Sequence, residues 1–237
     1  MTKQTIITLF SQSRLQGYTS LAEHETNLAL IGSISHKIGI LEIITRNKID
    51  SIMASHNELW LQNLPSHIES KGNLETMSRD KFISAQSLGF WLKIIEHYKI
   101  HNQIFPLEFL DNLNFKKYYP KNHRYFISTS ILRHHKVKAI LQLFRLIRNR
   151  AFHFENLYKM NEKGPRLSTK ITNRYDEGVI ISILPSKIIE FLNDLIASFD
   201  KKLVHYAERK DKGGDKCPLE NERIIHKKLD TKLKQGK

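Results

Sequence analysis

The chain has little of what defines several common classes of protein. Its 237 residues include one cysteine, Cys217, which excludes an internal disulfide and makes no zinc site by itself. The first residues lack the long apolar core and small-residue cleavage site of a signal peptide. An uninterrupted run of about 18 apolar residues is missing as well. We therefore expect a cytoplasmic protein that does not span a membrane.

Signatures of several chemistries are also missing. The sequence has no Gly-rich phosphate loop, no Ser nucleophile elbow and no zinc-ligand spacing. His134 and His135 are adjacent, so they face apart on a helix, and no carboxylate is near them in the sequence. We expect no cofactor and no metal site.

Acidic residues are absent from one long stretch, between Asn112 and Phe154, although the chain as a whole has 24 of them. The net charge is +14, and a nucleic acid, an anionic membrane or an acidic protein would each complement it. We predict RNA as the partner. The cations expected to bind it are Arg145, Arg150, Arg133, Lys136, Lys138, Lys116, Lys117, Lys121 and Arg124.

Proline and glycine are scarce enough to leave long stretches with helical spacing of apolar residues. This spacing predicts one helix or a broken pair of helices over about 23–53, and further helices from 78 to about 95, over 127–154 and over 185–207. Residues 179–184 are compatible with a short strand, but an extended linker is favoured. We expect an all-α domain over 1–207, followed by a basic tail over 208–237 that is mobile or ordered by a partner.

One short segment combines residue types suited to phosphodiester chemistry. Arg148 and Asn149 are followed by His153. Cleaving RNA without a metal needs proton transfer and positive charge at the phosphate. A histidine titrates near neutral pH, and an arginine presents a fork that matches phosphate oxygens. Asn149 is suited to orient the phosphate or the imidazole. The alternative is a basic helix end that complements the helix dipole.

The Arg-Asn pair, three residues and a His resemble the signature of the HEPN superfamily of helical ribonucleases, in its bacterial abortive-infection (Abi-like) branch. Three earlier segments, 10–18, 41–50 and 87–91, resemble other elements of that branch in the same order, so the resemblance covers roughly residues 9–155. It implies a HEPN-type helical bundle and a homodimer whose two motifs face each other. It also implies a metal-independent endoribonuclease in antiviral defence or in a toxin–antitoxin pair.

Two positions depart from that pattern. The branch often has a second histidine where Phe154 stands. Members silenced by a partner nucleotidyltransferase usually carry a tyrosine where Glu155 stands, so we do not expect that pairing. The regulator is then another protein antitoxin or a regulatory RNA, and the sequence leaves both open.

Helix geometry restricts how the motif can work. At about 100° per residue, Arg145, Asn149 and His153 share one face, whereas Arg148 lies about 140° from His153. Three arrangements would bring the two together. The helix ends near Phe152, or Arg148 reaches around the helix, or a second subunit completes the site.

Residues nearer the start of the chain are candidates to support the site. Glu42 and Arg46 have the spacing of a helix salt bridge, which we favour over a direct catalytic role for Arg46 and Asn47. Phe90 and Trp91 are expected in the core.

Metal-independent RNA cleavage, by attack of the 2′-hydroxyl, is the predicted function. The alternative is an RNA-binding protein that does not cleave and that forms a ribonucleoprotein with a regulatory RNA. A membrane-active effector is a weaker third, because the basic stretch has no lipid-facing apolar stripe separate from the core.

Overall fold

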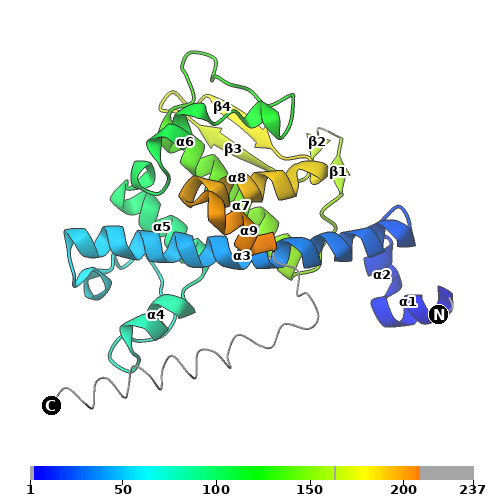
Figure 1. The fold of residues 1–237 in the computed structure, drawn as a ribbon, viewed down its shortest axis with the longest axis horizontal. Helices are drawn as coiled ribbons and strands as arrows, with labels where there is room; N and C mark the ends of the chain where they lie inside the picture. The colour runs from blue at the N-terminus through cyan, green and yellow to red at the C-terminus, as the bar shows by residue number, and fades with distance from the viewer. Residues whose placement is uncertain (1–2, 163, 209–237) are drawn as a thin grey trace.

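The computed structural model describes residues 3–162 and 164–208, and the chain is mostly helical over them (Figure 1). The α-helices are α1 (Lys3–Phe10), α2 (Gln12–Leu15), α3 (Leu21–His56), α4 (Arg79–Ala85), α5 (Leu88–Tyr98), α6 (Leu107–Asn112), α7 (Arg133–Phe152), α8 (Ile188–Phe199) and α9 (Lys201–Glu208). Short 3-10 turns are η1 (Trp60–Asn63), η2 (His101–Gln103), η3 (Phe115–Lys117) and η4 (Pro185–Lys187). The strands are β1 (Met160–Asn161), β2 (Gly164–Pro165), β3 (Ser168–Thr172) and β4 (Gly178–Ser182).

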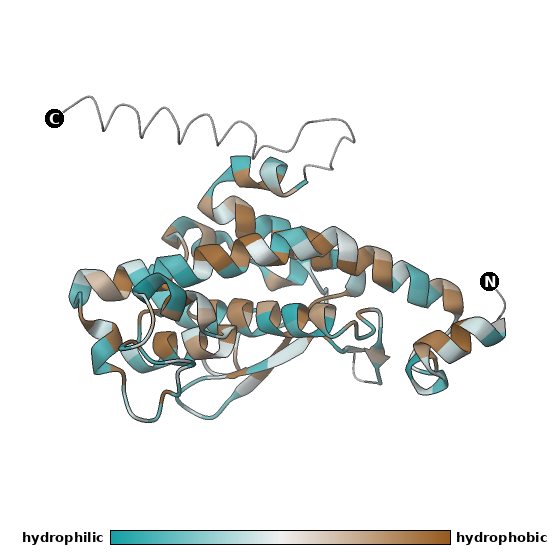
Figure 2. Ribbon diagram, turned by 90° about the horizontal axis from the view of Figure 1, so that it is seen from below, coloured by the Kyte–Doolittle hydropathy of each residue, from teal (hydrophilic) through white to brown (hydrophobic). Residues whose placement is uncertain are grey.

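Helix α3 crosses the whole molecule and packs against α5, α7, α8 and α9 (Figure 1). Its N-cap is Ser20, whose hydroxyl accepts a hydrogen bond from the Glu23 backbone N–H at 3.1 Å. Its apolar positions recur every three to five residues, and Ile34, Ile38 and Ile49 are fully buried. Figure 2 shows hydrophobic and hydrophilic positions alternating along this helix. Of the two arrangements expected over 23–53, one helix or a broken pair, the chain forms one unbroken helix.

Helix α7 carries the Arg148–His153 motif and is held from several sides. Its apolar positions from Ile140 to Ala151 form the buried face, and Phe144 and Ile147 are nearly or fully inaccessible. The predicted core positions Phe90 and Trp91 of α5 are buried as well. Because the apolar face of α7 is fixed against α3, α5 and β3, its polar face holds the motif at the surface.

The expectation of an all-α chain was wrong in part, because two small antiparallel sheets are present. Residues 179–184, for which a linker was favoured, include strand β4, which pairs with β3 from Ser168↔Ser182 to Thr172↔Gly178. Ile171 and Ile181 point into the core, and the hairpin packs on α7. Local pattern alone did not decide between strand and linker, because a short apolar run forms a strand only when a partner such as β3 pairs with it.

Several helix boundaries also differ from those predicted. Two predicted helices are each interrupted. Gln86 is extended before Ser87 caps α5, and Asp200 is extended before α9, where its carboxylate accepts from Lys202 N–H at 2.8 Å. Helix α7 begins at Arg133, after an isolated β-bridge that joins Tyr125 and Ser130. The predicted tail, 208–237, lies outside the described residues apart from Glu208.

By length and composition, α3 is also apolar enough to cross a bilayer, a property that the lack of an uninterrupted apolar run had hidden. In the structure 39% of its most apolar window is buried inside the protein. A core helix passes the same test, so this helix is weak support for a membrane location.

Candidate functional site

The motif sits where α7 ends, and the ending has the hydrogen bonds of a Schellman motif. The Phe154 N–H donates to Ala151 O at 3.0 Å, and the Glu155 N–H donates to Arg150 O at 2.8 Å. His153 is the last residue with near-helical geometry, and Phe154 follows in the left-handed region with φ 52°. Glycine usually occupies that position, because a side chain there is strained. The chain therefore turns sharply just after His153.

The side chain of His153 is exposed and lines a depression of about 510 Å³. The opposite wall comes from the segment after α1, which contributes Arg14 and Tyr18. Lys159 and Arg166 contribute two more positive charges, and Glu155, which also lines the depression, lies 3.0 Å from Arg166. The depression thus places an accessible imidazole among three cationic side chains, which is a suitable surface for a phosphate group.

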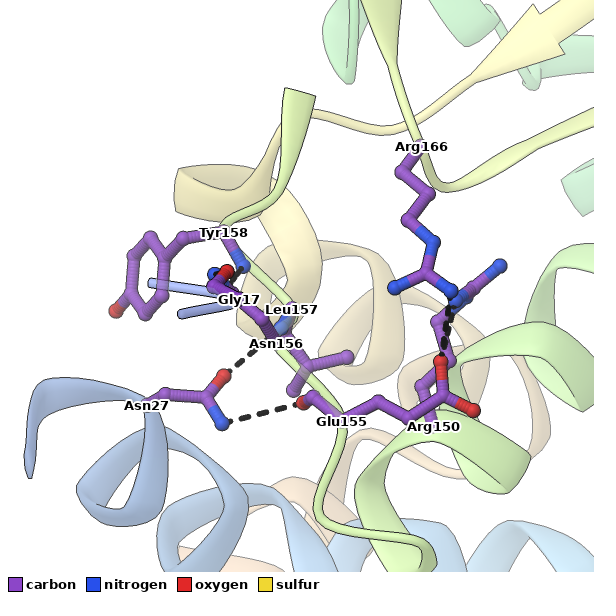
Figure 3. A network of polar contacts seen from close by, with 8 residues as sticks. All are labelled: Gly17, Asn27, Arg150, Glu155, Asn156, Leu157, Tyr158 and Arg166. Atoms are coloured by element: carbon purple, nitrogen blue, oxygen red, sulfur yellow. Dashed lines mark hydrogen bonds and ion pairs between the residues drawn. The ribbon is translucent and has the colours of Figure 1, made fainter. Parts of the chain in front are cut away.

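Two buried asparagines fix the chain that follows His153 (Figure 3). The Asn27 amide donates to Glu155 O at 3.1 Å and accepts from Leu157 N–H at 2.8 Å. The Asn156 amide donates to Gly17 O at 2.9 Å and accepts from Tyr158 N–H at 2.8 Å. Backbone groups of the segment are thereby paired across to the start of the chain.

Asn156 and Tyr18 extend this network on the side of the depression. Asn156 also donates to the Glu23 carboxylate at 2.7 Å, and Asn27 donates to the Tyr18 hydroxyl at 3.1 Å. Burial raises the pKa of Tyr18, so its phenol stays protonated at neutral pH. Both walls of the depression are consequently held by the same set of hydrogen bonds.

Arg148 points away from this depression, toward α3. Its Nε lies 3.2 Å from Oε2 of Glu42, its guanidinium lies 5.2 Å from the centre of the Phe152 ring, and it donates to Asn149 Oδ1 at 3.4 Å. It is not among the residues that line the depression with His153. Three arrangements could bring Arg148 and His153 together, and the first of them, a helix that ends near Phe152, is present. That ending alone does not bring Arg148 into the His153 depression.

Arg150 forms an ion pair within the protein and is not free to bind RNA. Its NH1 lies 2.7 Å from Oε2 of Glu155, and Arg166 approaches the same oxygen at 3.0 Å (Figure 3). The Nε of Arg150 is buried without a hydrogen-bond partner in the described part of the chain. Burial, then the neighbouring Arg166, lowers the pKa of Arg150. Glu155 therefore bridges two arginines beside the candidate site.

The cations predicted to bind RNA fall into two groups. Arg133 binds Asp111 through two contacts of 2.6 Å, Lys117 lies 2.6 Å from Asp194, and Lys138 lies 3.4 Å from Glu96. Lys136 donates to backbone carbonyls of residues 110 and 111. Exposed side chains without an ion-pair partner among residues 3–162 and 164–208 are Arg145, Lys116, Lys121 and Arg124. The stretch that lacks acids in sequence is thus partly neutralised by acids from other segments.

The predicted Glu42–Arg46 salt bridge was wrong. Glu42 pairs with Arg148 on α7, and Arg46 donates to Ser84 O at 3.2 Å. Asn47 is exposed. Because Glu42 holds Arg148, it is the member of this trio that contacts the motif.

No group of three or more His, Cys, Asp or Glu side chains suited to a metal occurs among the described residues. The expectation that His134 and His135 face apart was wrong, since their ring centres lie 3.9 Å apart, near His101. Burial is the largest cause of the lowered pKa of each of these three histidines. They pack at the start of α7, at the opposite end from His153.

Arg14, Tyr18, Lys159 and Arg166 were not predicted as site residues. Arg14 and Tyr18 lie in the segment 10–18 that resembles an element of the Abi-like branch, and this resemblance was the one signal that pointed to them. Lys159 and Arg166 carry no local signal, since only the turn after Phe154 brings them to His153.

No family model, curated protein or solved structure matches this chain significantly.

Proposed function

We propose that this protein is a metal-independent endoribonuclease with a HEPN-type fold, related to the Abi-like branch and acting in the cytoplasm in antiviral defence or as a toxin. The observation that carries the proposal is the depression in which the exposed His153 lies among Arg14, Lys159 and Arg166. An imidazole beside fixed cations has what 2′-hydroxyl transesterification requires. The products would be a 2′,3′-cyclic phosphate and a 5′-hydroxyl.

In this proposal each residue has a definite role. His153 takes the proton of the attacking 2′-hydroxyl. Arg14 and Arg166 stabilise the charge that develops on the phosphate, because a guanidinium can donate two parallel hydrogen bonds to its oxygens. Asn149 follows Arg145 by one helical turn, and its amide orients the substrate or the imidazole. The acid for the leaving oxygen is a second His153, supplied by another subunit.

Exposed apolar side chains around the motif support this homodimer. Phe152 and Phe154 flank His153 and are 41% and 52% exposed, and Leu9 on the neighbouring α1 is 68% exposed. Aromatic residues on a surface are favourable at the centre of an interface. A second copy would also bring another Arg148 close to the site. Light scattering that shows an active monomer would contradict this arrangement.

One observation favours the second candidate, an RNA-binding protein without cleavage activity. Arg148, the first residue of the motif, is paired with Glu42 and is not in the depression with His153. In this case the same basic surface would hold a regulatory RNA as part of a ribonucleoprotein. A protein antitoxin remains the other candidate regulator.

The test is to incubate the purified protein with total RNA, with and without EDTA, beside His153→Ala and an Arg148→Ala/His153→Ala double variant. We expect cleavage that survives EDTA and that falls by at least about 100-fold in both variants. His205→Ala is the matched control, since His205 is exposed on α9. Because His153 is exposed, its variant should keep the melting temperature. RNA binding without cleavage would support the second candidate.

A further inference from the structure

A second cavity, larger than the His153 depression, is lined partly by residues of α7. It is a groove of about 990 Å³ between α5, α7 and β3, which we call the α5–α7 groove. Its volume is at the upper end of the range for small-ligand sites. Its charged lining residues are the cations Lys71, Lys93, Lys138, Arg145 and Lys170 and the acids Glu69 and Glu96. The groove is therefore positively charged overall.

One of the two acids, Glu96, is already paired with neighbouring basic side chains. Glu96 lies 3.4 Å from Lys138, 3.2 Å from His101 and 3.8 Å from Lys99, and its pKa is lowered by these charges despite partial burial. The other groove cations have no ion-pair partner within the ranges that the structure describes, and all four are exposed: Lys71, Lys93, Arg145 and Lys170. Their charge is available to an anionic ligand.

The walls of the groove are fixed by side-chain amides. Gln86, only 5% exposed, accepts from Lys71 N–H at 2.8 Å and donates to Lys71 O at 2.7 Å and to Phe82 O at 2.8 Å. This ties the backbone of Lys71 to the end of α4. On the other wall, the Thr169 hydroxyl of β3 donates to the Gln142 amide oxygen of α7. Buried or half-buried hydrogen bonds thus hold the backbone at Lys71 and the strand that carries Lys170.

The groove leads toward the candidate active site along one face of α7. Arg145 lines the groove, Asn149 follows one turn later and His153 two turns later, about 12 Å along the helix axis. Arg145 and His153 are exposed, and Asn149 is half-buried. A ligand that fills the groove can therefore continue to His153 without crossing a buried part of the protein.

The distribution of charge suits a chain of phosphates. The four available cations line one groove but come from four different segments of the chain: the loop before α4, then α5, α7 and β3. Leu92 and Leu146 are partly exposed in the same groove and offer apolar surface to bases. A cavity of this volume accepts a few unstacked nucleotides, whereas a stiff duplex is recognised along an outer surface.

We propose that the α5–α7 groove binds a single-stranded segment of RNA beyond the cleaved bond, with its phosphates on Lys71, Lys93, Arg145 and Lys170. This inference rests on the proposed function, because it takes RNA as the ligand. It adds a second binding region, which would decide which single-stranded sites the protein accepts.

The test measures binding of a short fluorescent single-stranded RNA and of an RNA duplex by the full chain carrying His153→Ala, which prevents cleavage. A Lys71→Gln/Lys93→Gln/Lys170→Gln triple variant removes three groove charges. Its matched control is Lys48→Gln/Lys201→Gln/Lys202→Gln, which removes three exposed charges elsewhere. All six side chains are exposed, and thermal melting confirms that both triples fold.

We expect the groove triple to weaken single-strand binding by about tenfold or more, and to flatten the log–log salt dependence by about 0.7 for each phosphate that is no longer neutralised. The control should change affinity by less than about twofold, and duplex binding should be equal in both triples. Equal loss of affinity in the two triples would overturn the proposal. Poly-glutamate that competes as well as RNA would overturn it too, in favour of an acidic protein.

Failure of this proposal and failure of the proposed function give different results. If cleavage depends on His153 but the groove variants bind RNA normally, only the proposal that the groove binds RNA is contradicted. If the groove variants weaken RNA binding but the unmodified chain does not cleave RNA, the proposed endoribonuclease activity is contradicted and the groove is still an RNA-binding site.

Discussion

Arg148 of α7 and Glu42 of α3 form an ion pair across two helices, with the guanidinium Nε 3.2 Å from the carboxylate Oε2. Both side chains are partly buried, with 32% and 20% of their surfaces exposed. The pair keeps a negative charge next to the first residue of the motif. An approaching phosphate therefore meets an arginine whose charge is already largely compensated.

We predict that Glu42→Gln tightens RNA binding severalfold, because it removes that negative charge and keeps an acceptor for Arg148. The free energy of unfolding should fall by only about 0.5–1 kcal/mol, as for a partly exposed pair. Fluorescence anisotropy with RNA and urea denaturation measure the two effects. Glu25→Gln removes the same charge from an exposed site on α3 and serves as the control. Equal affinities of the two variants would show that Glu42 does not influence the RNA site.

Phe154→Gly should stabilise the protein. Phe154 has φ 52°, and 52% of its surface is exposed, so glycine relieves the left-handed strain and loses little burial. We expect the free energy of unfolding to rise by about 0.5–1 kcal/mol in urea denaturation. Phe154→Ala removes the ring but keeps the strain, and it should give no gain. If glycine destabilises the protein, the ring contributes more packing than its exposure indicates.

The Asn27 amide is predicted to hold the His153 turn in place. Asn27→Ala removes its bonds to Glu155 O and Leu157 N–H, and should lower the free energy of unfolding by about 2–4 kcal/mol. RNA cleavage at a temperature where the variant is folded should fall as well, although His153 is unchanged. Asn47→Ala, at an exposed position on the same helix, should change stability by less than about 0.5 kcal/mol. If folded Asn27→Ala cleaves RNA as well as the unmodified protein, the Asn27 hydrogen bonds to the turn are not needed for cleavage.

Stability should fall in acid because of His135. Burial, followed by the charges of His134, Lys138 and His101, lowers the pKa of His135 from 6.5 to about 4. Its Nδ1 accepts from the Leu132 N–H at 3.2 Å at the start of α7, which requires an unprotonated nitrogen.

The unfolded chain takes up this proton near pH 6.5, and the folded protein does so only near pH 4. This contribution to stability is therefore complete above pH 6.5 and is lost as the pH falls toward 4. Melting temperatures across that range should fall less steeply in His135→Gln, whose amide oxygen can still accept from Leu132. Parallel profiles of the two proteins would assign the acid sensitivity to other groups.

Sequence periodicity was sufficient to predict that α3 and α7 are helices. The apolar stripes of α3 and α7 recur at helical spacing, so both helices and the buried positions Ile140, Phe144 and Ile147 followed from local pattern. Strand β4 did not, because a short apolar run becomes a strand only when a partner such as β3 pairs with it. The interruptions at Gln86 and Asp200 also depended on side-chain contacts that periodicity does not contain.

The sequence by itself determined that His153 stands at the end of a basic helix, in a stretch without acids and beside Arg148 and Asn149. The tertiary structure decided which charges meet: Glu42 pairs with Arg148, Glu155 pairs with both Arg150 and Arg166, and Arg14 and Arg166 line the depression of His153. The physical reason is that a charge pairs with whatever the fold brings within a few ångströms. The packing of α7 on α3 brings Glu42 to Arg148, and the turn at Phe154 brings Arg166 to the depression that His153 and Arg14 line.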